Sequence, residues 1–324
     1  MILRAAVRAA TWAPSLHNTQ PWSFAIEGEE VSVRCDRDRQ LRAADEEGRQ
    51  LLVSCGAALF NLRLSLRAAG VEPVTRLSPD PDRPALLATV RVGPPVEADE
   101  VVRRMHAEIE RRRTHRAGFA DLSVPDELID GLVREAAGEA ATLTPVRDPA
   151  AVAALAALTE AAQFVQGQDQ KLSLELIRWA RPPGSTRGDG VPAEAYPRAP
   201  ASAFSSFAQR DYSGTHDWGR DSAETASGTS TGLVALVTTT GDSRTDWVAA
   251  GQALQAVLLH ASAYGLSAAF HTQALENPHL RAFLREEFCS DTYPQMIMRL
   301  GFTSEENIAV RRDLSEVLEG TDDG

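Results

Sequence analysis

Hydrophobic positions in the first part of the chain follow two periods. Apolar side chains recur at helical spacing over residues 2–12 and again from about Gly48 to Ala69, with Gly70 as the expected C-terminal stop. Between them, residues 23–36 alternate like the two strands of a hairpin that turns at Gly28. Residues 84–93 are largely apolar. The pattern predicts a helix, a hairpin, a long helix and a strand, in that order.

This pattern returns later in the chain. Residues 56–73 align without gaps on residues 251–268, and each helix precedes an apolar strand that ends in Arg-apolar-Gly. The identical pairs are Gly56/Gly251, Ala58/Ala253, Leu59/Leu254, Leu64/Leu259, Ala68/Ala263 and Gly70/Gly265. Chance similarity between two alanine- and leucine-rich helices explains the helix alone, but it explains the added strand less well. We therefore expect two related halves, residues 1–95 and 96–324.

The second half opens with charged helices. Residues 99–113 have helical spacing and end in a basic cluster, and residues 123–136 predict a helix capped by Ser123 with Glu127 close behind. From about 166 to 230 the chain is helical at first and then rich in proline, glycine, serine and aspartate. Aromatic residues recur along this stretch, at Trp179, Tyr196, Phe204, Phe207, Tyr212 and Trp218. We interpret it as a lid that packs on a site rather than as a disordered linker.

Composition narrows the function. The 324 residues are 43% hydrophobic, and 45 acidic against 33 basic residues give a formal charge of −12. This charge argues against binding to nucleic acids or anionic membranes. Cys35, Cys55 and Cys289 lack metal-site spacing, and Arg4 and Arg8 interrupt the apolar amino-terminal stretch. We expect a soluble cytoplasmic protein with small-molecule partners and no metal site.

Two polar motifs carry the candidate chemistry. "APSLHNTQPW", residues 13–22, follows the first helix, and "RRRTHRAGF", residues 111–119, precedes the helix at 123–136. By themselves they could be a polar turn and a solvated basic face. Guanidinium groups with a threonine hydroxyl also suit a dianionic phosphate, because arginine binds such a group bidentately.

These motifs resemble those of the FMN-dependent nitroreductases. The usual family patterns are R-R-S-x-R-x-F before a helix and P-S-x-x-N-x-Q-P-W, and two chains pair so that each flavin takes one motif from each subunit. Here the motifs occur once each, in inverted order, in different halves. With "DGVP" and "PQMIMRLG", the arrangement is similar to the actinobacterial Acg-like subfamily. The resemblance implies an α+β nitroreductase fold, built as a fused intramolecular pseudo-dimer of mixed sheets wrapped by helices, with one composite site.

The resemblance also implies the residues that bind FMN. The basic motif would hold its phosphate and ribityl chain, and the polar loop would contact the isoalloxazine edge or ribityl from the other half. The full candidate set is Ser15, His17, Asn18, Gln20, Arg112, Arg113, Thr114, Arg116, Thr272, Gln273, Arg311 and Arg312. Thr272 and Gln273 would lie near flavin N5, and Arg311, with Arg312, would complete the phosphate site. No side chain is implied as a catalytic acid or base.

The expected activity is a two-electron, ping-pong transfer from NADPH or NADH to a nitroaromatic, a quinone or a similar acceptor, by a monomer. A closed lid would instead make the protein a store for FMN, and an enclosed specific substrate would make it a biosynthetic flavoenzyme. The stretch "GTSTG" matches the nucleophile motif of serine hydrolases around Ser230, and His260 and His271 follow it in the chain. That motif, however, requires a strand before the serine and a helix after it, and the sequence shows polar residues and then a strand.

Overall fold

A computed structural model describes residues 1–78, 80–198, 207–212, 216–220, 228, 230–305 and 308–320. The first half contains α1 (Ile2–Thr11), η1 (Leu16–Asn18), β1 (Trp22–Glu27), β2 (Glu30–Cys35), η2 (Arg37–Arg39), α2 (Arg49–Ala68), β3 (Val71–Leu77) and β4 (Leu86–Pro95). The hairpin turns at Gly28, where φ is +60°, and α2 ends before Gly70, where φ is +86°. Both glycines therefore adopt the left-handed backbone that their turns require.

The second half is longer because helices are inserted between its strands. It contains α3 (Glu100–Glu108), α4 (Asp126–Gly138), β5 (Thr142–Val146), α5 (Pro149–Gln168), α6 (Gln170–Trp179), β6 (Ala180–Arg181), β7 (Val191–Pro192), η3 (Ala193–Ala195), β8 (Leu233–Thr239), α7 (Arg244–Ala263), β9 (Leu266–Phe270), α8 (Gln273–Glu276), α9 (Pro278–Phe288), β10 (Tyr293–Phe302), α10 (Leu314–Val317) and β11 (Leu318–Glu319). We call residues 169–232 the α5–β8 segment.

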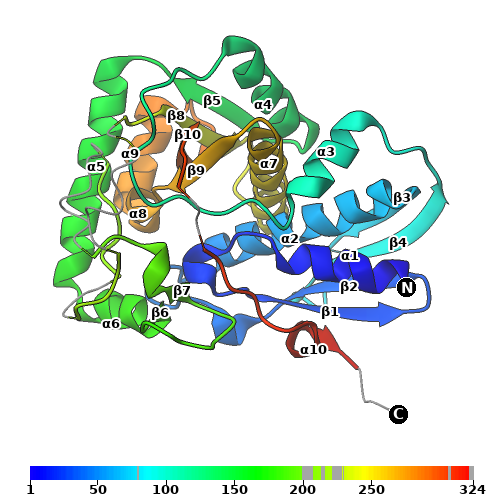
Figure 1. The fold of residues 1–324 in the computed structure, drawn as a ribbon. Coiled ribbons are helices and arrows are strands. Elements are labelled where there is room, and N and C mark those ends of the chain that lie inside the picture. Colours follow the sequence, from blue (N-terminus) through cyan, green and yellow to red (C-terminus); the bar gives the residue numbers. More distant parts are fainter. Residues whose placement is uncertain are drawn as a thin grey trace.

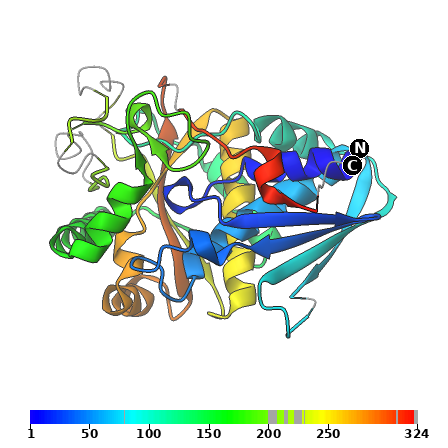
Figure 2. The ribbon, with the colours of Figure 1, turned by 90° about the horizontal axis from the view of Figure 1, so that it is seen from below.

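Two sheets share one strand order (Figures 1 and 2). The first sheet runs β11-β1-β2-β4-β3, and the second runs β5-β8-β10-β9. When the central helices α2 and α7 are matched, β1, β2, β4 and β3 correspond to β5, β8, β10 and β9, and every corresponding pair of neighbours is antiparallel. The extra strand β11 returns from the second half and pairs parallel to β1, with Leu318 opposite Phe24.

The two halves meet where α2 crosses α7 at the repeated glycines. A Cβ atom on Gly56 would lie 2.1 Å from the carbonyl oxygen of Val248, and one on Gly251 would lie 2.0 Å from that of Val53. Gly56 and Gly251 are equivalent in the repeat, and so are Val53 and Val248, so each helix makes the same contact with the other and the crossing is symmetric. One apolar core, to which both helices contribute, extends across the two halves.

The sheets differ in how they are covered. Strand β2 alternates between partly buried and buried residues, whereas β8 and β10 are buried at almost every position. The second sheet is therefore covered on both faces. Its outer face packs in a separate apolar cluster with residues of α5, α8 and α9, including Leu155, Leu275 and Leu284. Two helices, α2 and α5, are long and apolar enough to cross a membrane. The apolar window of α2 is 83% buried inside the protein, and that of α5 is 22% buried.

The α5–β8 segment folds against the rest of the chain where it is described. Asp189 forms ion pairs with Arg181 and Arg187 of the same segment and with Arg39 of the first half. Tyr196, Phe207 and Tyr212 are buried. Phe204, which the sequence analysis singled out, lies outside the described residues.

Two expectations about helix ends are wrong. The helix expected over 99–113 ends at Glu108, because the chain turns away to the second sheet, where the backbone N–H of His115 donates to the carbonyl oxygen of Ala268 at 2.8 Å. Ser123 does not cap the next helix. That helix begins at Asp126 after Pro125, whose φ of −61° already suits a helix start, and its N-terminus has no side-chain cap.

Candidate functional site

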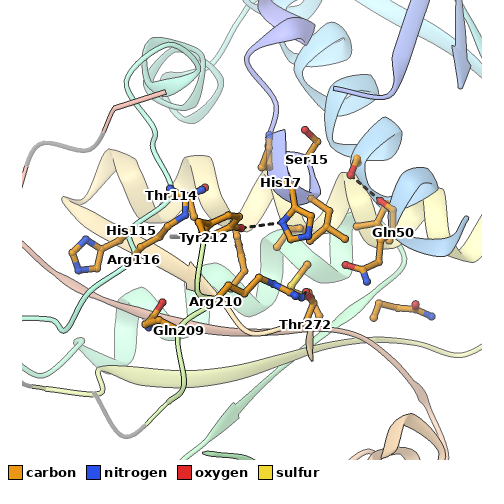
Figure 3. A pocket seen from close by; sticks show the side chains of 18 of the residues that line it. Ser15, His17, Gln50, Thr114, His115, Arg116, Gln209, Arg210, Tyr212 and Thr272 are labelled. Atoms are coloured by element: carbon orange, nitrogen blue, oxygen red, sulfur yellow. Dashed lines mark hydrogen bonds between the residues drawn. The ribbon is translucent and has the colours of Figure 1, made fainter. Parts of the chain in front are cut away.

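Two adjoining cavities lie between the halves. The larger cavity opens between the halves and encloses about 870 Å³ of empty space, a figure that includes its open mouth. It is lined by Pro14, Ser15, Leu16, His17, Gln50, Val53, Ser54, Thr114, His115, Arg116, Pro197, Gln209, Arg210, Tyr212, Leu254, Phe270, Thr272, Gln295 and Met296. Figure 3 shows His17, Arg210 and Tyr212 converging in this cavity. The polar loop, the basic motif and the α5–β8 segment thus share one site.

The smaller cavity continues from the larger one. It is lined by Pro14, Ser15, Asn18, Arg112, Thr114, Arg116, Gly190, Val191, Pro192, Ala195, Ile308, Ala309 and Arg311. Pro14, Ser15, Thr114 and Arg116 line both cavities. Apolar side chains contribute to the larger cavity, and three arginines surround the smaller one. The pair is suited to a ligand with an apolar part at one end and an anionic group at the other.

Local backbone conformation shapes the polar loop. His17, Asn18 and Gln20 have φ values of +50°, +55° and +49°, and this region costs a non-glycine residue about 1–2 kcal/mol. Hydrogen bonds hold the loop in this conformation. The Oγ atom of Ser15 accepts from the backbone N–H of Gln20 at 2.9 Å, and the side-chain amide of Asn18 donates to the carbonyl oxygen of Gly190 at 2.9 Å.

The arginines around the smaller cavity are only partly bonded. Arg311 donates to the side chain of Asn18 and to three backbone carbonyl oxygens, whereas Arg112 and Arg116 each donate to one backbone carbonyl oxygen. Burial and the neighbouring Arg113 and Arg116 lower the pKa of Arg112 to about 9, and burial with three other arginines lowers the pKa of Arg311 well below its ordinary value. Within the described part of the chain, none of Arg112, Arg116 and Arg311 forms an ion pair with a carboxylate. The Nε and Nη1 atoms of Arg112 and the Nε atom of Arg311 are buried without a hydrogen-bond partner.

Other arginines nearby are fully paired. Arg210 forms a short ion pair with Glu276, and Arg181 donates to a carboxylate oxygen of Asp189 at 2.9 Å. A buried guanidinium whose nitrogen atoms lack hydrogen-bond acceptors is costly, and an anionic ligand that supplied those acceptors would remove the cost. The unpaired cluster therefore fits an anion with several acceptor oxygens, such as a phosphate monoester.

Polar groups on the opposite side of the larger cavity form a bonded network. The hydroxyl of Thr272 donates to a carboxylate oxygen of Glu276 at 2.8 Å and accepts from Arg210 at 2.9 Å, and the side-chain amide of Gln50 donates to Glu276 at 3.1 Å. Burial lowers the pKa of His17 well below its ordinary value, and the charges of Arg210 and Arg116 add to this effect. Both effects favour the neutral form of the imidazole.

The candidate residues separate into two groups. Those that line a cavity are Ser15, His17, Asn18, Arg112, Thr114, Arg116, Thr272 and Arg311. Gln20, Gln273, Arg113 and Arg312 line neither of the two. The buried amide of Gln20 donates to the carbonyl oxygen of Gly188 and accepts from the backbone N–H of Arg312.

The remaining three of these are also engaged elsewhere. Gln273 contacts Gln163 and Ala208, and the guanidinium of Arg113 lies 4.8 Å from the ring centre of Trp12. Arg312 donates to the backbone of Gln20 and to Glu316. Together with Gln20, these side chains hold the loops around the cavities in place.

Sequence reasoning missed part of the cavity wall. Arg210 was not singled out, and Gln50 and Ser54 of α2 were read only as parts of an apolar helix. Polar residues four positions apart in an otherwise apolar, buried helix were the available signal, because this spacing puts both on one face. Nothing in the local sequence distinguishes Arg210 from the other arginines of the chain.

Two other chemistries receive no support. Ser230 pairs with Phe119 in an isolated bridge and precedes strand β8, so the strand-serine-helix turn of a hydrolase is absent here. His271 instead accepts a hydrogen bond from Arg299 at 2.8 Å. Among the described residues, no group of three or more His, Cys, Asp or Glu side chains could hold a metal ion.

Comparison with known proteins gives relatives over nearly the whole chain. The chain is 32% identical over 322 residues to "Putative NAD(P)H nitroreductase Rv3131" of Mycobacterium tuberculosis, covering 98% of this chain and 91% of the relative. A second protein of that organism, with the same description and the name acg, is 28% identical over 305 residues, covering 94% and 90%. No family model matches the chain.

Solved structures give a weaker likeness. A nitroreductase with bound FMN from Bacteroides fragilis is 13% identical, with a TM-score of 0.39, over 66% of this chain and 94% of that chain. A second, from Desulfitobacterium hafniense, is 14% identical with a TM-score of 0.39, over 66% and 96%. Superpositions with such scores are partial, and the family assignment rests on the mycobacterial relatives.

Proposed function

Because the chain belongs to the NAD(P)H nitroreductase family of these mycobacterial relatives, we propose that it is an FMN-dependent oxidoreductase. It would carry two electrons in a ping-pong cycle from NADPH or NADH to a small acceptor such as a nitroaromatic or a quinone. The acceptor binds after the reductant has left, so one cavity can serve both.

The unpaired arginine cluster is the observation that carries this proposal. The phosphate of FMN would lie in the smaller cavity, where it would supply acceptor oxygens to the orphaned nitrogens of Arg112 and Arg311. The isoalloxazine would lie in the larger cavity, beside Ser15, Thr114 and Arg116. Of the twelve candidate residues, Gln20, Gln273, Arg113 and Arg312 would act by positioning loops.

The protein's own part in the reaction is binding, orientation and electrostatics. When bound, FMN supplies the hydride chemistry, which no side chain of this site could supply. Arg116 places positive charge along the larger cavity, where it would favour a reduced, anionic ring. Residues 166–230, most of which belong to the α5–β8 segment, would act as the lid and exclude water from the reacting atoms.

We also propose that residues 1–95 and 96–324 are a fused pseudo-dimer with a single surviving flavin site. The matching strand orders and the symmetric glycine crossing support this. The fused halves would replace the family's subunit interface, so we expect a cytoplasmic monomer that binds neither nucleic acid nor membrane. A stable dimer in light scattering, formed through the α2–α7 surface, would contradict the fusion.

The decisive experiment is a visible spectrum of the purified protein, followed in the same anaerobic cuvette by NADPH and then NADH. Flavin bands that bleach would support a working reductase. A colourless protein that does not take up added FMN would overturn the cofactor assignment. A parallel titration with riboflavin, which lacks the phosphate, should give much weaker binding than FMN.

A store for FMN is the second candidate. One observation favours it: Tyr212 of the α5–β8 segment is 6% exposed and closes over the larger cavity through a hydrogen bond to His17. A lid held in this way could deny a nicotinamide its place beside the flavin. Bound flavin that neither nucleotide bleaches would support the store over the reductase.

A further inference from the structure

His17 and Tyr212 form a buried pair that phosphate binding does not explain. The Nδ1 atom of His17 lies 2.9 Å from the hydroxyl oxygen of Tyr212, at hydrogen-bonding distance. The two rings meet edge to face, with centroids 5.5 Å apart and planes at 86°. His17 is 5% exposed and Tyr212 is 6% exposed, and both line the larger cavity (Figure 3).

His17 also lines a second space, which we call the outer cavity. This cavity lies between α5 and α6, and its wall includes Gln166, Leu172 and Leu176. His17 thus borders both the outer and the larger cavity, as does Arg210. Its backbone is held in the left-handed region, with φ at +50°, although the resembled motif does not require histidine there. The fold maintains a strained residue at the border of both cavities.

The chemistry of the two groups suits proton transfer between these spaces. A neutral imidazole carries a donor on one nitrogen and an acceptor on the other, and a phenol can donate and accept at one oxygen. Such a pair can receive a proton on one side and release one on the other without either group holding a net charge afterwards. The positive charges of Arg210 and Arg116 oppose its protonation.

Resting on the proposed function, we propose that Tyr212 donates a proton to the electron acceptor in the larger cavity and that His17 reloads it from water in the outer cavity. Reduction of a quinone adds a hydride, which derives from NAD(P)H, and one proton. The O–H bond of Tyr212 breaks as the O–H bond of the product forms. The tyrosine oxygen takes the Nδ1 proton of His17, and Nε2 takes a proton from a water molecule, whose hydroxide leaves to solvent through the outer cavity. The imidazole ends as its other neutral tautomer and must exchange its Nε2 proton for one on Nδ1 before the next turnover, and neither residue changes oxidation state.

The first test compares two acceptors in the same variant. Menadione needs a proton for each hydride, whereas ferricyanide takes single electrons and no proton. In Tyr212→Phe we expect the ratio of the menadione rate to the ferricyanide rate to fall at least about tenfold, because a general acid contributes roughly 10²–10⁴-fold. His17→Gln should lower the same ratio less, because Tyr212 keeps its own proton for the donation and only its reloading is slowed. An unchanged ratio in Tyr212→Phe would overturn the proposal.

Tyr196→Phe is the matched control. Tyr196 is as buried as Tyr212 and its ring centroid lies 5.3 Å from that of Tyr212, but its hydroxyl has no hydrogen-bond partner and it does not line the larger cavity. The acceptor ratio of this variant should stay within about twofold of the unsubstituted protein. A drop equal to that of Tyr212→Phe would mean that packing, and not proton donation, sets the ratio, which would overturn the proposal.

The second test needs no flavin. In the flavin-free protein labelled with ¹⁵N-histidine, nuclear magnetic resonance should show a neutral His17 whose Nδ1 signal moves in Tyr212→Phe and not in Tyr196→Phe. A His17 Nδ1 signal that does not move in Tyr212→Phe would contradict the hydrogen bond between the two residues and overturn the proposal. Failure of NADPH and NADH to bleach the unsubstituted protein would instead overturn the reductase function, and this measurement of the pair would be unaffected.

Discussion

Arg91 and Arg299 occupy matching places in the two sheets, yet their surroundings are opposite. Arg91 on β4 has a side chain that is 67% exposed and lies 3.6 Å from Glu30. Arg299 on β10 is fully buried and donates to His271 at 2.8 Å and to the carbonyl oxygens of Thr231 and Ala117. The same Arg-apolar-Gly ending therefore serves as a surface residue in one half and as an internal anchor in the other.

Arg299 is buried because the second sheet has a covering layer on its outer face. The outer face of this sheet is covered by α5, α8, α9 and Phe207 of the α5–β8 segment. Because that face is covered, Arg299 is buried and donates to the carbonyl oxygen of Ala117 in the basic motif and to that of Thr231, just before β8. The guanidinium also lies between Phe119 and Phe207, 5.2 and 5.6 Å from their ring centres. Arg299 thus joins the basic motif to the covering segment.

The largest effect should come from the crossing that both halves share. Gly56→Ala or Gly251→Ala would place a methyl group about 2 Å from a backbone carbonyl oxygen, so the central helices would have to separate. We expect each to lower the free energy of unfolding by more than about 3 kcal/mol, measured by urea denaturation. Equal losses of unfolding free energy in the two variants would support a symmetric crossing of the two halves.

Gly138→Ala is the control for these substitutions. Gly138 is the last residue of α4, and a Cβ atom there would meet nothing within 4 Å. Alanine should leave the stability unchanged or raise it by roughly 0.5–1 kcal/mol, because glycine is the weaker helix former. If only one of the two crossing glycines proved sensitive, the halves would not share the crossing equally.

The next effect separates the two matched arginines. Arg299→Met should cost about 3 kcal/mol in urea denaturation, because three buried acceptors lose their donor. Arg91→Met should change stability by less than about 0.5 kcal/mol, as is usual for an exposed surface residue. Similar losses for both would contradict the view that only one half buries this arginine for a structural purpose.

The sequence predicted the shared framework better than it predicted this divergence. Hydrophobic period placed α1 and α2 to within a residue, because local spacing determines which helix face is buried. The repeated glycines Gly56 and Gly251 lie where the central helices α2 and α7 cross. Motif spacing brought Ser15, Asn18 and Arg112 together at the smaller cavity. It could not show that Gln20 and Arg312 bond to each other instead, or that Arg210 reaches the larger cavity. Those contacts join segments far apart in the chain, and composition does not encode them.

FMN affinity should separate the lining arginines from their exposed neighbours. Arg116→Ala removes a cation that lines both cavities, and we expect FMN binding to weaken by about 1.5–3 kcal/mol, roughly ten- to a hundredfold in Kd. Arg111→Ala is the matched control, because that side chain is 74% exposed and paired with Glu108. Fluorescence titration with FMN measures both. Unchanged affinity in Arg116→Ala would show that the phosphate lies elsewhere.

The smallest expected effect on stability concerns two aspartates, one before each central helix. Before α7, Asp242 accepts two hydrogen bonds of 2.7 Å from Arg281, and the hydrogen bonds from Arg281, Trp247 and Gln295 lower its pKa to about 2 despite partial burial. Before α2, burial raises the pKa of Asp45, although its carboxylate accepts from the backbone N–H groups of Gln50 and Leu51. The two carboxyl groups therefore shift in opposite directions.

The pH dependence of stability should follow these signs. A carboxyl whose pKa falls on folding stabilises the native state above its unfolded pKa, near 4, and that contribution is lost as the pH falls through about 2. Asp242→Asn should therefore cost about 2 kcal/mol at pH 7, and its difference from the unsubstituted protein should shrink between about pH 4 and pH 2. Asp45→Asn should show the opposite trend, becoming relatively less stable as the pH falls. Urea denaturation across this range measures both, and parallel trends in the two variants would mean that the halves do not treat these acids differently.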